Sequence, residues 1–519
     1  MATSYILSQI NIPQFISYAL LLLISYKCTL YIQRLYFHPL SKFPGPKIMA
    51  MSRVYEFYWD SYLHGRLWSH LPSLHDKYGP IVRIGPDEIH IRDSAYFDHI
   101  FGFRPLDKWA IAARQFGLKY AMFGIEEYKL YVKRRAAFGD SFSKSKSFKL
   151  QPLVNEKIEK GCKIMRRKGK EGGSVDLAFL FRAVTAEIIT EYMYGQQYGF
   201  FEDERTTRGL YDRRFDVLFG VTHLGRFIPW MVPIILIFLR SQIKALFGSK
   251  EPTASFLDFN NFAEKMQRKL IEQEGTHVDL NIGENNKTAA EVYIHSSLPL
   301  GDKTGSALTQ ATMAAWSGGW DTTAFSLTQT AYLVLQHPDV LKKLQAELRE
   351  VWPDMSEDAS MALLGDLPYL NAVVKEGLRL MHGALSRLTR VNPAVPEQYK
   401  GWTIPPGTKI SMSTSDLHYD KEIWGDDVLV FRPDRWIDRP DLDRWLATFS
   451  KGTRVCAGQE LAWLELKMIL GALFRRFEMR IPEDEKVTDA DILPYCDGFT
   501  PGPKNNMQRL PVVVKSVAS

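Results

Sequence analysis

The stretch FSKGTRVCAGQE, Phe449–Glu460, contains one of only four cysteines in a chain of 519 residues. After this cysteine, Cys456, apolar residues recur at three- and four-residue steps, which predicts an amphipathic helix with the cysteine at its N-terminus. The free N–H groups and the positive dipole end of such a helix stabilise a thiolate. Gly452 and Gly458 permit tight turns around the sulfur, and Arg454 offers a forked cation to a carboxylate beside a metal. We therefore expect a thiolate metal ligand rather than a lone buried cysteine, which is the usual alternative.

The bulk composition indicates a large folded protein. Hydrophobic residues make up 45% and aromatic residues 13% of the chain, which is ample for a buried core. The net charge of +6 is a small difference between 65 basic and 59 acidic residues, so no nucleic-acid partner is expected. The cysteines form neither a CxxC pair nor a disulfide framework, which favours a reducing compartment. Dinucleotide, P-loop, zinc-protease and serine-hydrolase motifs are all missing from the sequence.

The N-terminus carries the apolar run IPQFISYALLLLISYKCTLYI, Ile12–Ile32, whose one charge is Lys27. As a helix this run is long enough for the hydrocarbon core of a bilayer, roughly 30 Å thick. No positive charge precedes it and no small-residue cleavage pattern follows, so an uncleaved anchor is favoured over a signal peptide. The positive charges that follow the run place the rest of the chain in the cytosol. We expect a single-pass protein of the endoplasmic reticulum membrane.

Three regions are expected along the chain. Residues 1–33 form the membrane anchor, with its helix at about 12–32, and residues 34–50 form a proline-rich hinge. The hinge contains FHPLSKFPGPK, where proline restricts both its own backbone and that of the preceding residue. Residues 51–519 form the catalytic domain.

The body of the chain is predicted to be mainly helical. Helical patterns dominate from about 97 to 350, whereas YGPIVRIGPDEIHIRD, Tyr78–Asp93, predicts a hairpin of two short strands. Residues 395–415 again predict short strands, around a PPG turn at Pro405–Gly407. The expected fold class is mainly α with a minor β-sheet subdomain, preceded by a transmembrane helix.

The segment FSKGTRVCAG matches the FxxGxRxCxG signature at every defined position, and the chain therefore resembles the cytochrome P-450 family of haem-thiolate monooxygenases. This resemblance implies the cytochrome P-450 fold and haem b, with its iron bound through Cys456 and a propionate bound by Arg454. A cysteinate ligand pushes electron density onto iron, which favours O–O cleavage.

The segment SGGWDTTAF, Ser317–Phe325, resembles the family's [AG]Gx[DE]T[TS] pattern and lies in a helical pattern from about 306 to 336. Two adjacent glycines within a helix cost roughly 1 kcal/mol each, so a groove with room for dioxygen is a reason for them. Asp321 and Thr322 form an acid–alcohol pair that could relay protons into a dry pocket. Without Cys456, helix packing and a solvated Asp321 would be the simpler interpretation.

Three further segments support the resemblance. Glu376 and Arg379 in KEGLRL, with Arg435 in FRPDRW, correspond to a buried structural triad of the family. YVKRRAAFGDSFS resembles the helix that carries W-x-x-x-R, so Arg135 corresponds to a propionate-binding arginine and Tyr131 replaces the tryptophan.

Two interpretations around this haem region stay open or depend on the resemblance. Either Arg387 or Arg390 gives another haem contact, and the sequence leaves the choice open. The basic residues 133–135 are expected to form a solvated face, and the resemblance implies that the acidic surface of the family's reductase docks on this side.

The expected function is insertion of one oxygen atom from O₂ into a small hydrophobic substrate. YFHPLSKFPGPK resembles membrane-bound fungal enzymes of secondary metabolism, including oxygenases of trichodiene-like terpenes, so a terpenoid is the first candidate substrate and a polyketide or alkaloid the second. Electrons are expected from NADPH through a separate cytochrome P-450 reductase, with cytochrome b5 and membrane lipid as further partners. A haem-thiolate isomerase or dehydratase and a non-catalytic haem sensor are the alternatives.

Four segments are candidate walls of the substrate pocket: residues 104–124, the helix before Gly318, residues 383–386 and the turn near Phe499. Their surroundings are aromatic, which suggests a bulky hydrophobic guest, although aromatic residues at this density more often form plain core. The aromatic candidates are Phe101, Phe103, Trp109, Phe116, Phe123 and Trp316.

Overall fold

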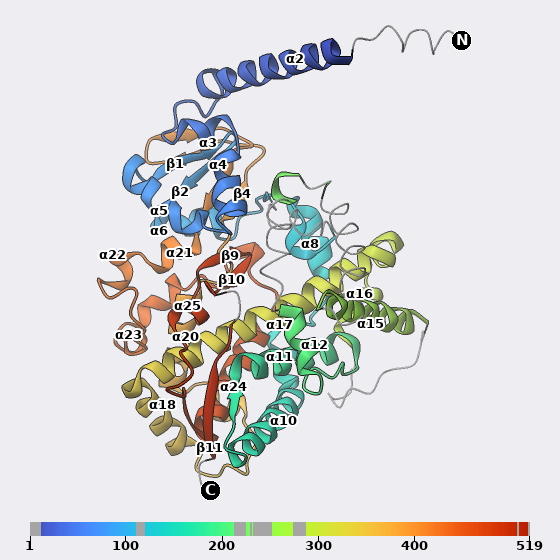
Figure 1. Ribbon diagram of the computed structural model, residues 1–519, viewed down its shortest axis with the longest axis vertical. Coiled ribbons are helices and arrows are strands. Elements are labelled where there is room, and N and C mark those ends of the chain that lie inside the picture. Colours follow the sequence, from blue (N-terminus) through green and yellow to red (C-terminus); the bar gives the residue numbers. More distant parts are fainter. Residues whose placement is uncertain are drawn as a thin grey trace.

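The computed structural model describes residues 12–109, 120–211, 225–228, 231, 252–272, 287–505 and 508–516. Within these ranges the chain is mostly helical, with four small sheets. Figure 1 shows the helices gathered in the lower body, the N-terminal strands above them, and one helix that projects away at the top. This arrangement confirms the expected mainly α fold with a minor β component.

Among the described residues, seven long helices build the body, and the other helices of the body are short. The long ones are α10 (Gln151–Lys170), α11 (Leu177–Tyr194), α15 (Pro252–Glu272), α17 (Gly305–Gln336), α18 (Pro338–Val351), α20 (Pro368–Met381) and α24 (Gln459–Arg476). The short α-helices are α3 (Lys47–Met51), α4 (Val54–Phe57), α5 (Leu67–Tyr78), α6 (Ser94–Phe101), α8 (Tyr128–Ala136), α9 (Lys144–Lys149), α12 (Glu204–Tyr211), α16 (Ala289–Ile294), α19 (Met361–Leu364), α21 (Thr414–His418), α22 (Lys421–Trp424), α23 (Asp434–Asp438) and α25 (Asp489–Ile492). Single turns of other helix types are η1 (Gln33–Phe37), η2 (Tyr58–Tyr62), η3 (Met122–Gly124), η5 (Leu300–Asp302), η6 (Pro440–Trp445) and η7 (Gly452–Arg454).

Helix α17 is the centre of this body. It covers the helical pattern expected from about 306 to 336 and packs against α11, α18, α20 and α24. Figure 1 shows it crossing the molecule diagonally. Its second half, from Thr323 to Val334, is buried on every side, so the helix is fixed in place by neighbours all around it.

The strands form small sheets around this body. The largest has the order β1-β2-β7-β4, in which β2 and β7 are parallel and the other pairs are antiparallel. The first pair confirms the predicted hairpin, and the turn between β6 and β7 contains Gly407 with a φ of 76°. The strands are β1 (Ile81–Gly85), β2 (Glu88–Ile91), β3 (Ser174–Asp176), β4 (Leu388–Val391), β5 (Glu397–Tyr399), β6 (Trp402–Ile404), β7 (Lys409–Met412), β8 (Phe477–Arg480), β9 (Cys496–Gly498), β10 (Thr500–Gly502) and β11 (Pro511–Ser516).

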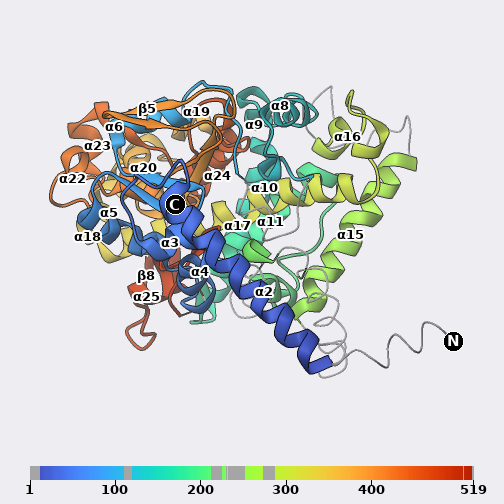
Figure 2. The ribbon, with the colours of Figure 1, turned by 90° about the horizontal axis from the view of Figure 1, so that it is seen from above.

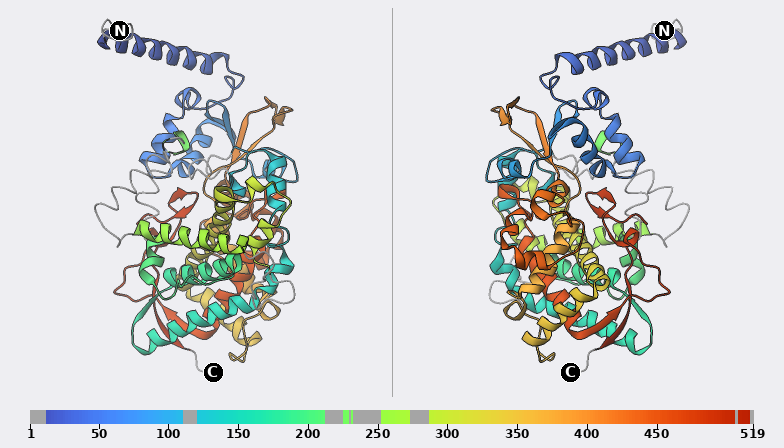
Figure 3. Two further views of the ribbon diagram at one scale, coloured as in Figure 1. Left: turned by 90° about the vertical axis from the view of Figure 1, so that its right-hand side faces the viewer. Right: turned by 90° about the vertical axis from the view of Figure 1, so that its left-hand side faces the viewer.

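The projecting helix is α2, Ile12–Ile32, which has the predicted bounds. With the turn that follows, it supplies a candidate membrane span at Ile16–Phe37 whose apolar side chains are exposed. Seen from above and from both sides, α2 leaves the body at the small N-terminal sheet and extends beyond it (Figures 2 and 3). An exposed apolar helix of this length at the N-terminus fits a single-pass membrane anchor.

The segment expected to be a hinge packs on the body. Leu40 and Phe43 are buried in the core cluster of the N-terminal sheet. At Gly45 a Cβ would lie 2.4 Å from the carbonyl oxygen of Arg83, so only glycine allows the chain to pass this close to β1. The boundaries at 33 and 50 stay predictions.

The expected triad is present and fully buried. Glu376 accepts hydrogen bonds from Arg379 at 2.8 and 2.9 Å and from Arg435 at 2.9 Å. The indole N–H of Trp436 also donates to Glu376, at 2.9 Å. Because every charge here has a partner, the triad can hold α20 against the loop at residues 424–436 without an isolated buried ion.

Candidate active site

The loop before Cys456 is held in place by the backbone. Gly452 has a φ of 65°, and a Cβ on it would lie 1.9 Å from the carbonyl oxygen of Gly102, so glycine is required there. The backbone N–H of Cys456 donates to the carbonyl of Phe449 at 2.9 Å. Helix α24 begins at Gln459 with Gly458 as its N-cap, so the prediction that the helix begins at the cysteine is wrong by three residues.

The sulfur of Cys456 lies in a setting that is open on one side. The side chain is accessible to solvent, and a Cβ on Gly458 would meet nothing within 4 Å. The protein around the sulfur is nevertheless dense enough that burial raises the pKa of the thiol, while the Gly458 N–H and Arg135 act in the opposite direction. A cation close to this sulfur would lower the pKa of the thiol and favour the thiolate.

Arg135 and Arg454 both lie close to this loop. Arg135 donates to the carbonyl of Val455 at 2.6 Å and to the phenol oxygen of Tyr131 at 2.8 Å, so the tyrosine accepts a hydrogen bond. Arg454 donates to the carbonyls of Ile125 and Glu126 at 2.9 and 2.8 Å, and its buried Nε has no hydrogen-bond partner. An unpaired guanidinium N–H inside a protein indicates a missing acceptor.

Two more cations, Lys108 and Arg390, complete this group, and no sequence pattern indicates such a role for Lys108. Lys108 is partly buried, donates to the carbonyl of Phe123, and has a pKa well below the usual value because of desolvation and the neighbouring Arg454 and Arg390. Burial and Arg454 likewise lower the pKa of Arg390 to about 9. In the described part of the chain, neither side chain forms an ion pair. Cations that depress one another in this way favour an anionic ligand.

Arg387 lies in a different environment. It is buried and donates to Glu88 at 2.6 Å and to Glu56 at 2.8 Å, and Arg53 pairs with the same two carboxylates. These carboxylates raise the pKa of Arg387 against the effect of burial. The charge of Arg387 is thus already balanced within the N-terminal region, whereas that of Arg390 is not.

The expected cationic surface at residues 133–135 is only partly present. Arg134 is buried, donates to Asp302 at 2.6 Å and faces the ring of Tyr120. Lys133 is exposed and Arg135 faces the cysteine loop. The interpretation of all three as one solvated face is therefore wrong for Arg134, because it joins α8 to η5.

The two glycines of α17 have different surroundings. A Cβ on Gly318 would meet nothing within 4 Å, and Gly318 and Ser317 are exposed in the middle of a helix that is otherwise largely buried. A Cβ on Gly319 would lie 2.8 Å from the Ile189 side chain of α11. The groove interpretation therefore fits Gly318, and helix packing explains Gly319.

Asp321 and Thr322 take different hydrogen-bond partners. Asp321 is buried and accepts from Thr500 at 3.2 Å, and Arg182 lies 3.9 Å from its other oxygen. The Thr322 hydroxyl donates to the carbonyl of Gly318, one turn earlier, at 2.5 Å. This bond places the hydroxyl beside the open position at Gly318.

The aromatic candidates for the substrate pocket divide into two groups. Phe123 stacks on Phe499 with ring centroids 5.4 Å apart, which brings two of the expected pocket walls together. Trp316 belongs to the core: its indole N–H donates to Thr190 at 2.8 Å, and its ring stacks on Phe259. Phe103 is 88% exposed, so it lines no interior wall.

The remaining aromatic candidates for the substrate pocket are Trp109, Phe101 and Phe116. Trp109 stacks beneath the cations Arg53 and Lys409, at 4.2 and 3.9 Å from the ring. Phe101 stacks on Phe97 and faces Arg390. Phe116 lies outside the described residues. The pair Phe123–Phe499 is thus the part of the predicted aromatic wall that the described structure supports.

The comparison with protein families agrees with this site. The family model for cytochrome P450 matches residues 46–508, so the chain belongs to the cytochrome P450 family. It is similar to fungal monooxygenases of secondary metabolism: the cytochrome P450 monooxygenase MO6277 of Ascocoryne sarcoides is 34% identical over 510 residues, covering 95% of this chain and 97% of its own.

Two other relatives carry names that state an activity. The conidiogenone synthase PchP450 of Penicillium rubens is 33% identical over 461 residues, covering 88% of this chain and 90% of its own. The tryptophan 6-hydroxylase fscE of Fusarium equiseti is 30% identical over 496 residues, covering 94% of each chain. Relatives at similar identity thus bear names for different reactions, so similarity alone does not select a substrate for this chain.

Proposed function

We propose that this cytochrome P450 inserts one oxygen atom from O₂ into a hydrophobic intermediate of a fungal biosynthetic pathway, and that the intermediate is a terpenoid. The Phe123–Phe499 pair and the open position at Gly318 favour an apolar guest of some bulk. The same chemistry on a polyketide or an alkaloid is the alternative.

The residues present fit haem b. Cys456 would bind the iron, because its sulfur is accessible and the adjoining Gly458 leaves space for a large planar group. Arg135, Arg390 and Arg454, with Lys108, would bind the propionates, since these cations have no carboxylate partner in the described structure and Arg454 has a free N–H. Bound haem supplies the redox chemistry that activates O₂, and the thiolate tunes it.

Asp321 and Thr322 would supply protons to that chemistry. The Thr322 hydroxyl lies next to the open position at Gly318 and can pass a proton to a group bound there. Asp321 is buried, held by Thr500 and near Arg182, so its carboxyl group has a fixed orientation. The two would exchange protons through water or by rotation of a side chain.

The remaining components lie outside this chain. We propose that electrons come from NADPH through a separate cytochrome P450 reductase, with cytochrome b5 as a second donor. The exposed apolar helix α2 supports a membrane location, which we assign to the endoplasmic reticulum with the catalytic domain in the cytosol.

One observation carries this proposal: the accessible sulfur of Cys456 lies near cations that have no carboxylate partner. Replacing Cys456 by alanine should abolish haem binding and the carbonyl-adduct absorption band of the reduced protein. Cys28→Ala is the matched control, because Cys28 is exposed on α2, and it should leave both unchanged. Normal haem content in Cys456→Ala would refute the assignment.

The substrate can be tested by co-expression with a reductase and metabolite profiling on terpenoid, polyketide and alkaloid panels. A monooxygenase should consume O₂ and NADPH and yield hydroxylated or epoxidised product. Product without O₂ consumption would instead identify an isomerase or dehydratase, and bound haem with no turnover of any panel member would favour a haem-binding role without catalysis.

A further inference from the structure

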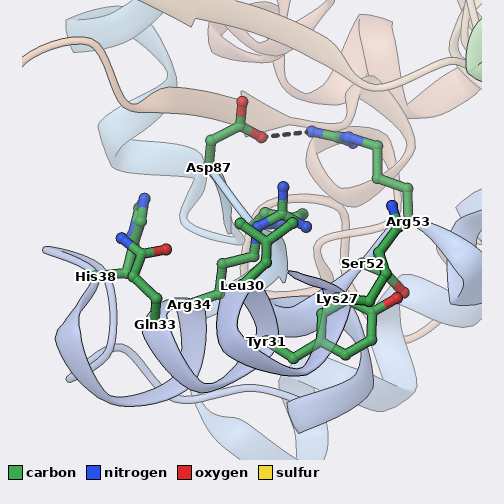
Figure 4. A pocket seen from close by; sticks show the side chains of 10 residues that line it. Lys27, Leu30, Tyr31, Gln33, Arg34, His38, Ser52, Arg53 and Asp87 are labelled. Carbon is green, nitrogen blue, oxygen red and sulfur yellow. Dashed lines mark hydrogen bonds and ion pairs between the residues drawn. The ribbon is translucent and has the colours of Figure 1, made fainter. Parts of the chain in front are cut away.

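A cavity of about 440 Å³ lies where the membrane helix meets the N-terminal sheet. Figure 4 shows side chains of α2 and η1 on one side of this cavity and the pair Arg53–Asp87 on the other. Lys27, Tyr31 and Arg34 line it at steps of four and three residues, so they lie on one face of the helical segment, and His38 lines it from just beyond η1. The cavity therefore belongs to the junction between anchor and body, away from the cysteine loop.

The charges on the body side of this cavity are already paired. Arg53 forms ion pairs with Asp87 at 2.8 Å, Glu56 at 2.7 Å and Glu88 at 2.9 Å. Asp87 also binds Lys409 at 2.6 Å. Neither Arg53 nor Asp87 thus needs a ligand.

The charges on the anchor side are not paired. Among the described residues, neither Lys27 nor Arg34 forms an ion pair, and the printed hydrogen bond of the Arg34 guanidinium goes to the carbonyl of Met51 at 2.6 Å. Because the one carboxylate among the lining residues, Asp87, is already paired with Arg53 and Lys409, these two cations leave a positive potential inside the cavity.

Arg83 also contributes to the positive potential of the cavity. It is buried and donates to the carbonyls of Arg34, Leu40 and Pro86, at 2.9, 3.3 and 2.6 Å. Burial and the nearby Arg34 lower its pKa to about 10, which is the direction expected for a cation without a counter-ion. Lys27 and Arg34 thus line the cavity without an acid partner, the buried Arg83 lies next to Arg34, and no unpaired acid is among the cavity residues.

We propose that this cavity binds the phosphate group of an anionic phospholipid from the membrane leaflet that α2 enters. The C-terminal part of the candidate span Ile16–Phe37, from Lys27 on, lines the cavity, and the exposed Tyr36 and Phe37 are typical of the level of the headgroups. Lys27 and Arg34 would donate to the phosphate, and the acyl chains would lie along the apolar surface of α2. The proposal rests on the membrane location proposed above, because a soluble chain would meet no such lipid. If the cytosolic orientation also holds, the leaflet is the one rich in anionic lipid.

The test uses the full-length holoenzyme in mild detergent, with its melting temperature measured against soluble ligands below their micelle concentration. Dihexanoyl phosphatidic acid and dihexanoyl phosphatidylserine should raise the melting temperature, whereas dihexanoyl phosphatidylcholine and inorganic phosphate at equal concentration should not. Lys27→Gln and Arg34→Gln should each weaken the apparent affinity about tenfold, as expected for one lost charged contact.

Lys42→Gln and Lys47→Gln are the matched controls. Both lysines are exposed, lie in the same N-terminal region and do not line the cavity. Their replacement by glutamine removes the same charge as the two test substitutions. Both control variants should bind the anionic lipids with the same apparent affinity as the unchanged protein. An equal loss in all four variants would overturn the proposal, because the binding would then be general surface attraction.

Two other results would also overturn it. No shift with either anionic lipid would refute lipid binding, and an equal shift with inorganic phosphate would identify a site for soluble anions. Haem content and the carbonyl-adduct band should be normal in every variant. A failure of lipid binding with normal haem therefore leaves the proposed enzymatic function intact, whereas loss of haem in the unchanged protein would be a failure of that function.

Discussion

The carboxylate of Asp321 accepts a hydrogen bond from the hydroxyl of Thr500 at 3.2 Å. Asp321 lies in the middle of α17, whereas Thr500 begins β10 near the C-terminus. The residue before Thr500 is Phe499, which stacks on Phe123 in the candidate substrate wall. One short hairpin thus contacts both the acid proposed to handle protons and the wall proposed to contact substrate.

Replacing Thr500 by valine should reduce the fraction of NADPH that ends in product. Valine keeps the shape of threonine and removes the hydroxyl that orients Asp321, so proton delivery becomes less regular while the haem site is untouched. The measurement is product and peroxide formed per NADPH consumed, together with the pH profile of coupling.

Thr500→Ser is the control for this prediction, because it restores the hydroxyl without the methyl group. We expect it to recover most of the coupling that valine loses. Equal coupling in Thr500→Val and the unchanged enzyme would show that the hydrogen bond has no role in proton delivery.

Replacing Thr322 by alanine should keep the haem and divert reducing equivalents to peroxide. The Thr322 hydroxyl is the group next to the open position at Gly318, and a positioned proton donor contributes roughly 10²-fold or more to rate. We expect the rate of product formation to fall by about that factor, measured as product and peroxide per NADPH.

Thr328→Ala is a close structural control on the same helix. Thr328 also donates to the carbonyl four residues earlier, that of Ala324, at 2.8 Å, but it is buried in the core. It should lower stability slightly and leave coupling unchanged. The same peroxide yield in both variants would mean that the effect comes from the helix and not from the relay.

Arg390 and Arg387 should respond to substitution in opposite ways. Arg390→Gln removes a cation that has no carboxylate partner, so the haem-loss rate should rise about tenfold while the free energy of unfolding changes little. Arg387→Gln breaks the buried ion pairs with Glu56 and Glu88, which should cost about 3 to 5 kcal/mol of stability. The measurements are haem transfer to an acceptor globin and urea unfolding. Faster haem loss from folded Arg387→Gln than from Arg390→Gln would reverse our assignment.

Local sequence patterns were sufficient to predict the main elements of this fold. The bounds of α2 follow from an uninterrupted apolar run, and the β1–β2 hairpin follows from β-rich runs between Gly-Pro pairs. The haem-binding role predicted for Cys456 rests on a fixed motif of neighbouring residues and still awaits its test. Patterns of this kind need no knowledge of distant contacts.

Contacts between distant segments were not predictable in the same way. Nothing near Lys108 indicates that it lies beside Arg390 and Arg454, and nothing near Thr500 indicates that it binds Asp321. The choice between Arg387 and Arg390 likewise depends on Glu56 and Glu88, which are far away in the sequence. The run of basic residues around Arg134 predicts a solvated face. Arg134 is nevertheless buried, because Asp302 from another element balances its charge.

A largely buried carboxyl group beside the N-terminal sheet gives a prediction about pH. Asp416 lies on α21 with its side chain 10% exposed, and one of its oxygens is 3.9 Å from Nε2 of His90. Burial raises the pKa of Asp416 to about 7, with a contribution from Asp420 and opposition from Arg92. His90 in turn hydrogen-bonds to His75 at 2.7 Å, and burial lowers the pKa of both, that of His75 to about 4. Both histidines are therefore neutral between pH 5 and 8.

Replacing Asp416 by asparagine should remove part of the pH dependence of stability over this range. The folded protein holds the Asp416 proton up to a pKa of about 7, above the value of 3.8 expected when unfolded, so the stabilisation is present at low pH and is lost as pH rises through 7. Between pH 5 and 8, the unchanged protein should therefore lose about 2 to 3 kcal/mol relative to Asp416→Asn. The measurement is urea unfolding of both proteins at pH 5, 6.5 and 8, with Asp426→Asn as a control, since Asp426 is almost fully exposed. A difference between the two proteins that is constant across this range would show that Asp416 is ionised in the folded state throughout.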